Sequence, residues 1–360
     1  MHSQESAVIA SLSAAFVDFL CHLLDDQGYG TQEWSDQVTE KTRSNRFSKI
    51  SRAARIERIL LSEQGQHAIR RVASWNEALT TGNLDKLTEF HDKFRFICVV
   101  GIPRTGGSYL TSELYQALGY NPEAVPAVVA HDGFPDARPF KIGPGNTWIE
   151  ILSALAQYLT TVEMYFDTRN ARPKSGRVVV PKKLTKAVYA GALFRSVFGA
   201  DAHYFLTVRN PVSACLSTID KSGGMPAGEK FEARSNIERW AERDVSWLIK
   251  DASECRIMDY FHVYVKYWEL YHYRMALCGI LQPGNFTVVP YEKYSMIQVA
   301  DQWRNAFGSE SAAGDFYIGK PGIEKRSDWS EMSNAAIHRV ASVWESVGLN
   351  FPVEALLKGY

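Results

Sequence analysis

The sequence predicts an α/β fold in which helices cover both faces of a central parallel sheet. Four short apolar runs have the character of strands that are covered on both faces: Phe96–Val100, Arg177–Val180, His203–Val208 and Phe286–Val289. Segments with apolar residues at helical spacing separate these runs. Alternating strands and helices are typical of a doubly wound parallel sheet, so we expect three layers, helix on sheet on helix.

Length and composition predict a large folded domain with an appendage. The chain has 360 residues and is 46% hydrophobic, whereas single cores stop growing at roughly 250–300 residues. We expect an N-terminal helical segment over residues 1–93 and an α/β domain over residues 94–360. Forty basic residues balance forty acidic ones. This balance provides no general attraction to nucleic acid or acidic membranes, so any anion site has to be local.

The cysteines and the N-terminus indicate a cytoplasmic protein. Five scattered cysteines without a C-x-x-C pair favour neither disulfides nor a thiolate zinc site, and a reducing compartment explains them. The apolar run Ala7–Leu24 is interrupted by Asp18 and His22 and has no basic region before it. We interpret it as an amphipathic helix, not as a signal peptide or a membrane span.

Helical spacing continues through most of the chain outside the strands. The predicted helices are Ala7–Leu24, Ile50–Leu61, Ala68–Leu79, Ser108–Leu118, Leu184–Phe198, one that starts at Pro211, Phe231–Ile249, Ile257–Gly279, Ser295–Phe307 and Glu331–Val347. The aromatic residues of Tyr260–Tyr273 fit a helix with a core face better than a substrate cage. The proline- and glycine-rich stretch Pro122–Gly145 is expected to form a long functional loop.

The segment Gly101–Ser108 has the spacing of a nucleoside-triphosphate loop, G-x-x-x-x-G-K-[ST], with Gly107 in place of the lysine. Such a loop turns backbone N–H groups toward an anion at the N-terminus of the next helix. The missing lysine would reach the β- and γ-phosphates, and the cation here is Arg104 instead. We expect a phosphate site that does not take a triphosphate. The alternative is a tight strand–helix turn that uses glycine for geometry alone.

A second element follows the third predicted strand. Arg209-Asn210-Pro211 begins at the carboxyl end of that strand, and Ser217 lies eight residues after Arg209. The eight residues span about two helical turns, so we expect the side chains of Arg209 and Ser217 to lie on the same side of the helix. There they would reach a second phosphate beside the loop. A strand-terminal salt bridge and a solvated serine are the alternative.

Together these segments resemble the sulfotransferases that use 3′-phosphoadenosine 5′-phosphosulfate (PAPS), with a P-loop-like fold, as in bacterial and Golgi members. The family's P-[KR]-[ST]-G-[TS]-[TS] loop corresponds to Pro103–Ser108, and its R-[DN]-P with a serine eight residues on corresponds to Arg209–Pro211 and Ser217. A strand that ends in tyrosine-glutamate corresponds to Val288–Glu292. The resemblance spans about residues 94–330.

The resemblance implies roles for individual residues. Arg104 and the amides of the loop would bind the 5′-phosphosulfate, while Arg209 and Ser217 would bind the 3′-phosphate. The implied cofactor-binding residues are Arg104, Thr105, Gly106, Gly107, Ser108, Tyr109, Arg209, Ser217, Lys325 and Arg326. Tyr109 takes the place of a tryptophan that stacks on the adenine. Lys325 and Arg326 match a basic C-terminal stretch only approximately, and a surface charge pair is the alternative.

The implied reaction is in-line transfer of a sulfuryl group to a hydroxyl or amine of a small molecule or glycan, with no metal. Arg104 would stabilise the leaving group electrostatically, and Lys182 and Lys183, expected directly after the second strand, would supplement it. The family's catalytic histidine has no counterpart there. His131 is the preferred base because of its ordinary pKa, with Glu123, Asp132 or a lysine such as Lys183 as alternatives.

Two other functions remain open at this stage. One is a nucleotide or small-molecule kinase with a degenerate phosphate loop. The other is a non-catalytic nucleotide-binding protein of the same fold. The acceptor and the oligomeric state are not readable from the sequence.

Overall fold

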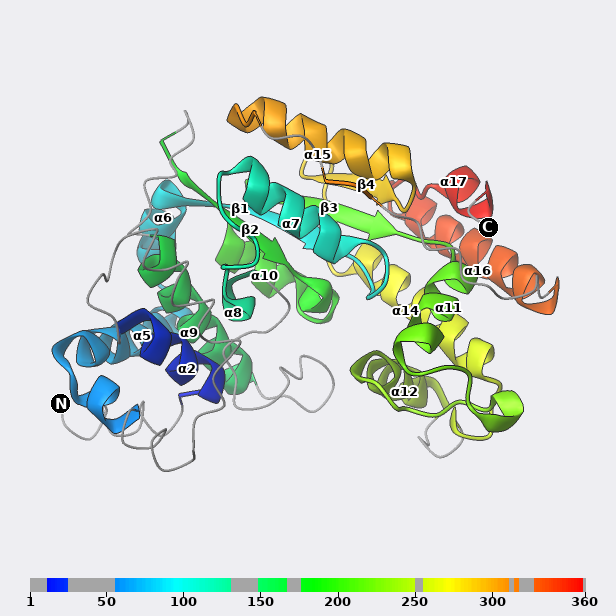
Figure 1. The fold of residues 1–360 in the computed structure, drawn as a ribbon, viewed down its shortest axis with the longest axis horizontal. Helices are drawn as coiled ribbons and strands as arrows, with labels where there is room; N and C mark the ends of the chain where they lie inside the picture. The colour runs from blue at the N-terminus through cyan, green and yellow to red at the C-terminus, as the bar shows by residue number, and fades with distance from the viewer. Residues whose placement is uncertain are drawn as a thin grey trace.

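Four strands form one parallel sheet at the centre of the molecule (Figure 1). The computed structural model describes residues 12–24, 56–130, 148–166, 176–249, 255–310, 314–316 and 327–358. The strands are β1 (Phe94–Val100), β2 (Val178–Lys183), β3 (His203–Val208) and β4 (Phe286–Pro290), in the spatial order β2-β1-β3-β4. The predicted α/β fold with a parallel sheet is therefore confirmed.

The two edge strands carry the prolines of the sheet. Pro181 lies inside β2, and Pro290 ends β4. Proline lacks the N–H that a central strand needs, so both positions suit an edge. The prediction that Lys182 and Lys183 follow the second strand is wrong. β2 continues through both residues, with Lys182 opposite Cys98 and Lys183 opposite Val99.

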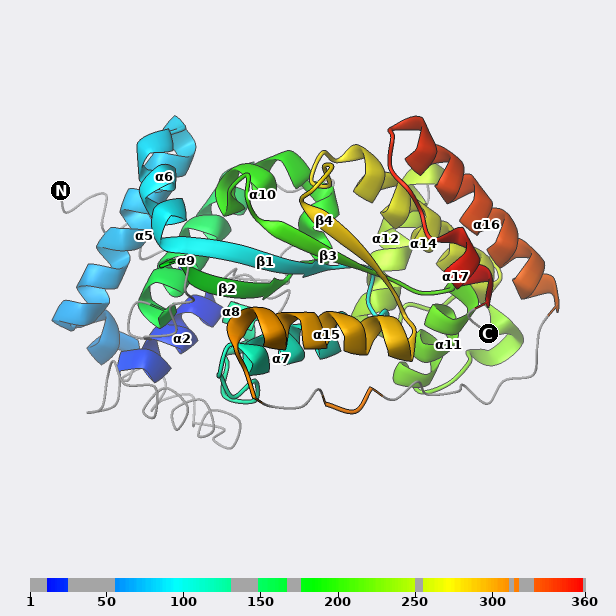
Figure 2. The ribbon, with the colours of Figure 1, turned by 90° about the horizontal axis from the view of Figure 1, so that it is seen from above.

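One face of the sheet is covered by α7 (Gly107–Ala117) and α15 (Lys293–Phe307), which lie side by side in Figure 2. Residues at alternating strand positions, among them Val99 and Phe205, pack against Leu114 and Trp303 of these helices. This alternation follows from the two-residue repeat of a strand.

The opposite face is covered by a larger helical layer. Its members next to the sheet are α9 (Trp148–Phe166), α10 (Gly191–Phe198) and α14 (Tyr260–Leu277), with the 3₁₀ helix η1 (Thr185–Tyr189). Four further helices extend this layer: α11 (Pro211–Lys221), α12 (Asn236–Ile249), α16 (Ser327–Ser346) and α17 (Val353–Lys358). Two short elements are α8 (Ala127–Ala130) and η2 (Ala227–Glu229). Helices thus lie on both faces, and the aromatic side of α14 forms core as predicted.

The N-terminal helices α2 (Ala14–Leu24), α5 (Glu63–Thr81) and α6 (Leu84–Lys93) pack at one end of the sheet, opposite α16 and α17 (Figure 1). Phe90 of α6 lies between Trp75 of α5 and Phe96 of β1, with ring centroids 5.3 and 6.1 Å away. The described part of the N-terminal segment therefore shares its hydrophobic core with the sheet.

Several helices differ from the sequence prediction. Helix α9 was not predicted, although Ile151, Leu155, Leu159 and Val162 repeat at helical spacing and are all buried. The single helix expected over Leu184–Phe198 is two pieces, η1 and α10, separated at Ala190. Among the helices of the described segments, none is both long and apolar enough to cross a bilayer.

Candidate functional site

Hydrogen bonds of buried threonine hydroxyl groups hold the loop between β1 and α7 in its conformation. The buried Thr105 Oγ1 donates to Ile102 O at 2.7 Å and lies 2.7 Å from Thr207 Oγ1. Thr207 belongs to β3, and its hydroxyl donates to Val100 O at 3.2 Å. These contacts tie the loop to two neighbouring strands, so Thr105 supports the loop and does not face outward.

Two glycines allow the close packing of this loop. Gly106 is the N-cap residue of α7 and has a left-handed φ of 90°. A Cβ atom there would lie 2.5 Å from Met296 Cε and 3.1 Å from the ring of Tyr291. Gly101 donates its N–H to Tyr271 Oη at 3.1 Å, which anchors the start of the loop to α14. Side chains at these glycines would displace the loop from its neighbours.

Arg209, at the carboxyl end of β3, is a buried cation. Its side chain is only 6% exposed, and Nη1 donates to Arg104 O at 3.1 Å. The Nε atom has no hydrogen-bond partner, and within the described segments no carboxylate pairs with this guanidinium. Burial lowers the pKa of Arg209, but a guanidinium stays protonated at neutral pH. An unpaired buried cation of this kind favours an anionic ligand.

Arg104 joins Arg209 and Ser217 in one cluster. Arg104 has a left-handed φ of 74°, which is uncommon for a residue with a side chain. Its carbonyl accepts from Arg209, and its Nε donates to Ser217 Oγ at 3.0 Å. The sequence predicted that Arg209 and Ser217 lie beside the loop, and in the structure both contact Arg104 of the loop, Arg209 through the Arg104 carbonyl and Ser217 through the Arg104 Nε. They place two positive charges and one hydroxyl at the carboxyl edge of the sheet.

The two adjacent lysines of β2 point to opposite faces. Lys183 reaches the loop between β1 and α7, where Nζ donates to Ser108 Oγ at 3.3 Å and Cε lies 3.4 Å from a Cβ placed on Gly107. The buried Lys182 points to the helical layer, where Nζ donates to Val128 O at 3.0 Å and lies 4.2 Å from the ring centre of Tyr158. Only Lys183 of this pair contacts the loop.

Tyr109 is packed sideways against the connection that follows α15. Its ring centroid is 4.7 Å from that of Phe316, and its hydroxyl donates to Gly314 O at 2.9 Å. Burial raises the pKa of Tyr109 to about 12, so the hydroxyl stays protonated. Part of the ring is thus already covered by Phe316.

The predicted catalytic base cannot be placed. His131 and its alternative Asp132 lie outside the described residues, as do Lys325 and Arg326. Glu123 is exposed, and its N–H donates to Asn121 Oδ1 at 3.1 Å, as in a simple turn.

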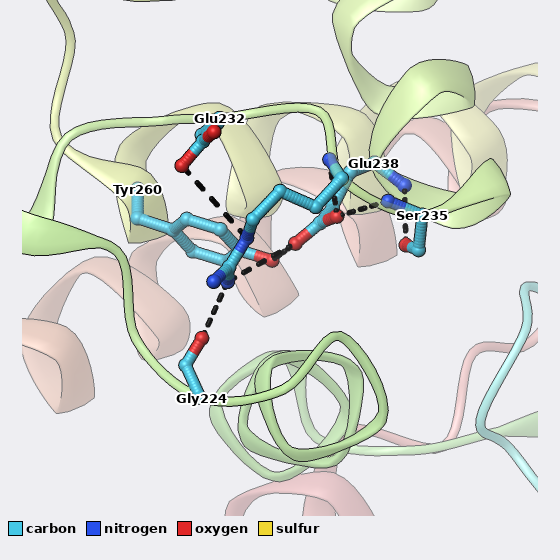
Figure 3. Close-up of polar contacts among 6 residues, drawn as sticks. Gly224, Glu232, Ser235, Glu238 and Tyr260 are labelled. Carbon is cyan, nitrogen blue, oxygen red and sulfur yellow. Dashed lines mark hydrogen bonds and ion pairs between the residues drawn. The ribbon is translucent and has the colours of Figure 1, made fainter.

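A second polar cluster, which the sequence did not reveal, lies beyond α11 (Figure 3). The buried Glu238 accepts from the N–H groups of Arg234 and Ser235 at 2.8 and 2.6 Å and from Tyr260 Oη at 2.5 Å. The N–H of Glu238 donates to Ser235 Oγ, which completes a capping box at the start of α12. Arg234 also donates to Gly224 O. These contacts bind the connection between α11 and α12 to both α12 and α14. The carboxylate of Glu238 therefore has a structural role, because both of its oxygens accept hydrogen bonds.

No family model, curated protein or solved structure matches this chain. Over the described segments, no group of three or more histidine, cysteine or acidic side chains is arranged to hold a metal ion.

Proposed function

We propose that this protein is a sulfotransferase that uses PAPS as the sulfuryl donor. The observation that carries the proposal is the buried Arg209 guanidinium, which has no carboxylate partner among the described residues and lies against Arg104 at the edge of the sheet. A cation held in this way lacks a counter-charge, and a phosphate would supply one.

The residues fit a ligand with two separate anionic groups. The glycine-rich loop, the N-terminus of α7 and Lys183 form one end of the site, and Arg209 and Ser217 form the other. Arg104 belongs to the loop and contacts both Arg209 and Ser217, so it lies between the two ends. Because residue 107 is glycine, the loop has no lysine that could bind a third phosphate of a triphosphate. The side chain of Lys183 passes close to this position instead. This arrangement suits a P-loop-like site for a nucleotide phosphorylated at two positions. When bound, PAPS would supply an activated sulfuryl group.

The chain's own residues would act mainly through charge. Lys183 and Arg104 are placed to stabilise negative charge that develops at the loop. The guanidinium of Arg104 offers a planar fork of donors to an oxyanion, whereas the ammonium of Lys183 is a compact point charge. The acceptor, a hydroxyl or amine of a small molecule or glycan, requires a base, for which His131 remains the candidate.

A thermal-shift measurement tests the proposal against its alternatives. We expect stabilisation by 3′,5′-diphosphoadenosine without magnesium. Stabilisation only by ATP with magnesium would instead favour the kinase alternative. Binding of the diphosphate without turnover of PAPS over a panel of acceptors would favour a non-catalytic nucleotide-binding protein.

Arg209→Ala provides the residue-level test. It should weaken 3′,5′-diphosphoadenosine by about 1.5–3 kcal/mol, because it removes a charged hydrogen-bond donor. The affinity for adenosine 5′-monophosphate should change little. Arg239→Ala on the exposed side of α12 is the matched control. Equal losses for both nucleotides would show that Arg209 has a structural role only.

A further inference from the structure

The face of the Arg209 guanidinium lies on the ring of Tyr291, which directly follows β4. The Arg209 Cζ atom is 4.0 Å from the ring centre. Among the described residues, the side chain makes one hydrogen bond, from Nη1 to Arg104 O, and Nε makes none. With a single hydrogen bond, the guanidinium can still rotate about the line from Nη1 to the Arg104 oxygen. Its contact with the ring of Tyr291 therefore determines the plane of the guanidinium.

Tyr291 is itself held firmly in place. Its N–H donates to Val208 O at 2.8 Å, which continues the β3–β4 ladder by one residue. Its ring meets Phe316 edge to face, with centroids 5.0 Å apart and an interplanar angle of 72°. The ring also borders Gly106, where an added Cβ would lie 3.1 Å away. The ring of Tyr291 therefore lies between Gly106 of the glycine-rich loop and the guanidinium of Arg209.

We propose that Tyr291 is a positioning residue. It holds the guanidinium of Arg209 in the orientation in which the guanidinium N–H groups donate hydrogen bonds to an oxyanion. The ring covers one face of the guanidinium, and the in-plane N–H groups form forked contacts with an anion. The identity of that anion as a nucleotide 3′-phosphate rests on the proposed function. Tyr291 would then determine how strongly the protein prefers a 3′-phosphorylated nucleotide.

The test compares Tyr291→Leu, which removes the aromatic face, with Tyr291→Phe, which keeps it. The readout is the ratio of the dissociation constants for adenosine 5′-monophosphate and 3′,5′-diphosphoadenosine. Tyr291→Leu should lower this ratio about three- to thirtyfold, and Tyr291→Phe should stay within about twofold of the wild type. The control is Tyr294→Leu, three residues on in the first turn of α15, because Tyr294 is 77% exposed.

A double-mutant cycle separates positioning from a general loss of structure. In an Arg209→Ala background, Tyr291→Leu should change the ratio no further, because Tyr291 acts through Arg209. Equal weakening of both nucleotides by Tyr291→Leu, or the same effect with and without Arg209, would overturn the inference.

Inorganic sulfate distinguishes a failure of this inference from a failure of the proposed function. If the wild type does not discriminate between the two nucleotides, the proposed function fails. Thermal stabilisation by sulfate that is lost in Arg209→Ala and Tyr291→Leu, but kept in Tyr291→Phe, would still support the positioning role. Equal sulfate stabilisation in all four proteins would refute it.

Discussion

Replacing Lys182 and Lys183 separately by alanine should have opposite consequences, although the two residues are adjacent. Lys183 is partly exposed, and its Nζ donates a hydrogen bond to Ser108 Oγ at 3.3 Å. Removing a contact of this kind at the surface should change the free energy of unfolding by less than about 1 kcal/mol. If Lys183 binds the anion, however, the loss of its charge should weaken 3′,5′-diphosphoadenosine about ten- to a hundredfold.

Lys182→Ala should lower the free energy of unfolding but leave the affinity for 3′,5′-diphosphoadenosine unchanged. The Lys182 side chain is completely buried, donates to Val128 O and lies over the ring of Tyr158. Removing a desolvated cation–π contact and a charged hydrogen bond, and leaving a cavity, should cost about 2–4 kcal/mol of unfolding free energy.

Urea unfolding and calorimetric titration of 3′,5′-diphosphoadenosine, carried out on both variants, measure the two effects. The comparison is internally controlled, because the substitution is the same and the positions are neighbours in one strand. The reasoning would be refuted if Lys182→Ala remained as stable as the wild type but lost affinity, or if Lys183→Ala bound the nucleotide normally.

Three further predictions concern the loop, the core and the second polar cluster. Gly106→Ala should destabilise the protein by about 1–2 kcal/mol from the left-handed backbone alone, and by more if Met296 cannot move; urea unfolding measures this, and an unchanged midpoint would contradict it. Burial lowers the pKa of His272 to about 4, so the unfolded chain takes up a proton between about pH 6.5 and 4 while the folded protein does not. Stability should therefore fall by about 2 kcal/mol from pH 7 to pH 5, and His272→Phe should flatten this dependence. Glu238→Gln should lower stability by about 1–3 kcal/mol, because an amide cannot accept all the hydrogen bonds of the carboxylate; nucleotide affinity should be unchanged, and a parallel loss of affinity would place this cluster in the site.

The local sequence determined the positions of the strands and the glycine-rich loop that follows β1. Continuous apolar runs form strands that are covered on both faces, and β3 begins and ends where the run His203–Val208 predicted. The spacing of Arg209 and Ser217 predicted that both lie beside the loop, because eight residues span about two helical turns, and both contact Arg104. Alternating elements were sufficient to predict a parallel sheet.

Only the tertiary structure decided what each side chain of the site faces. The strand alternation that separates Lys182 from Lys183 depends on β2 continuing past Pro181, which is tolerated because β2 lies at the edge of the sheet. The contact of Tyr291 with Arg209 joins residues 82 positions apart through the β3–β4 pairing. Such contacts depend on which strands become neighbours, and strand order is not encoded in local periodicity. The same reason explains why the contact of Glu238 with Tyr260 of α14 could not be read from the sequence, whereas its contacts with Arg234 and Ser235 are local.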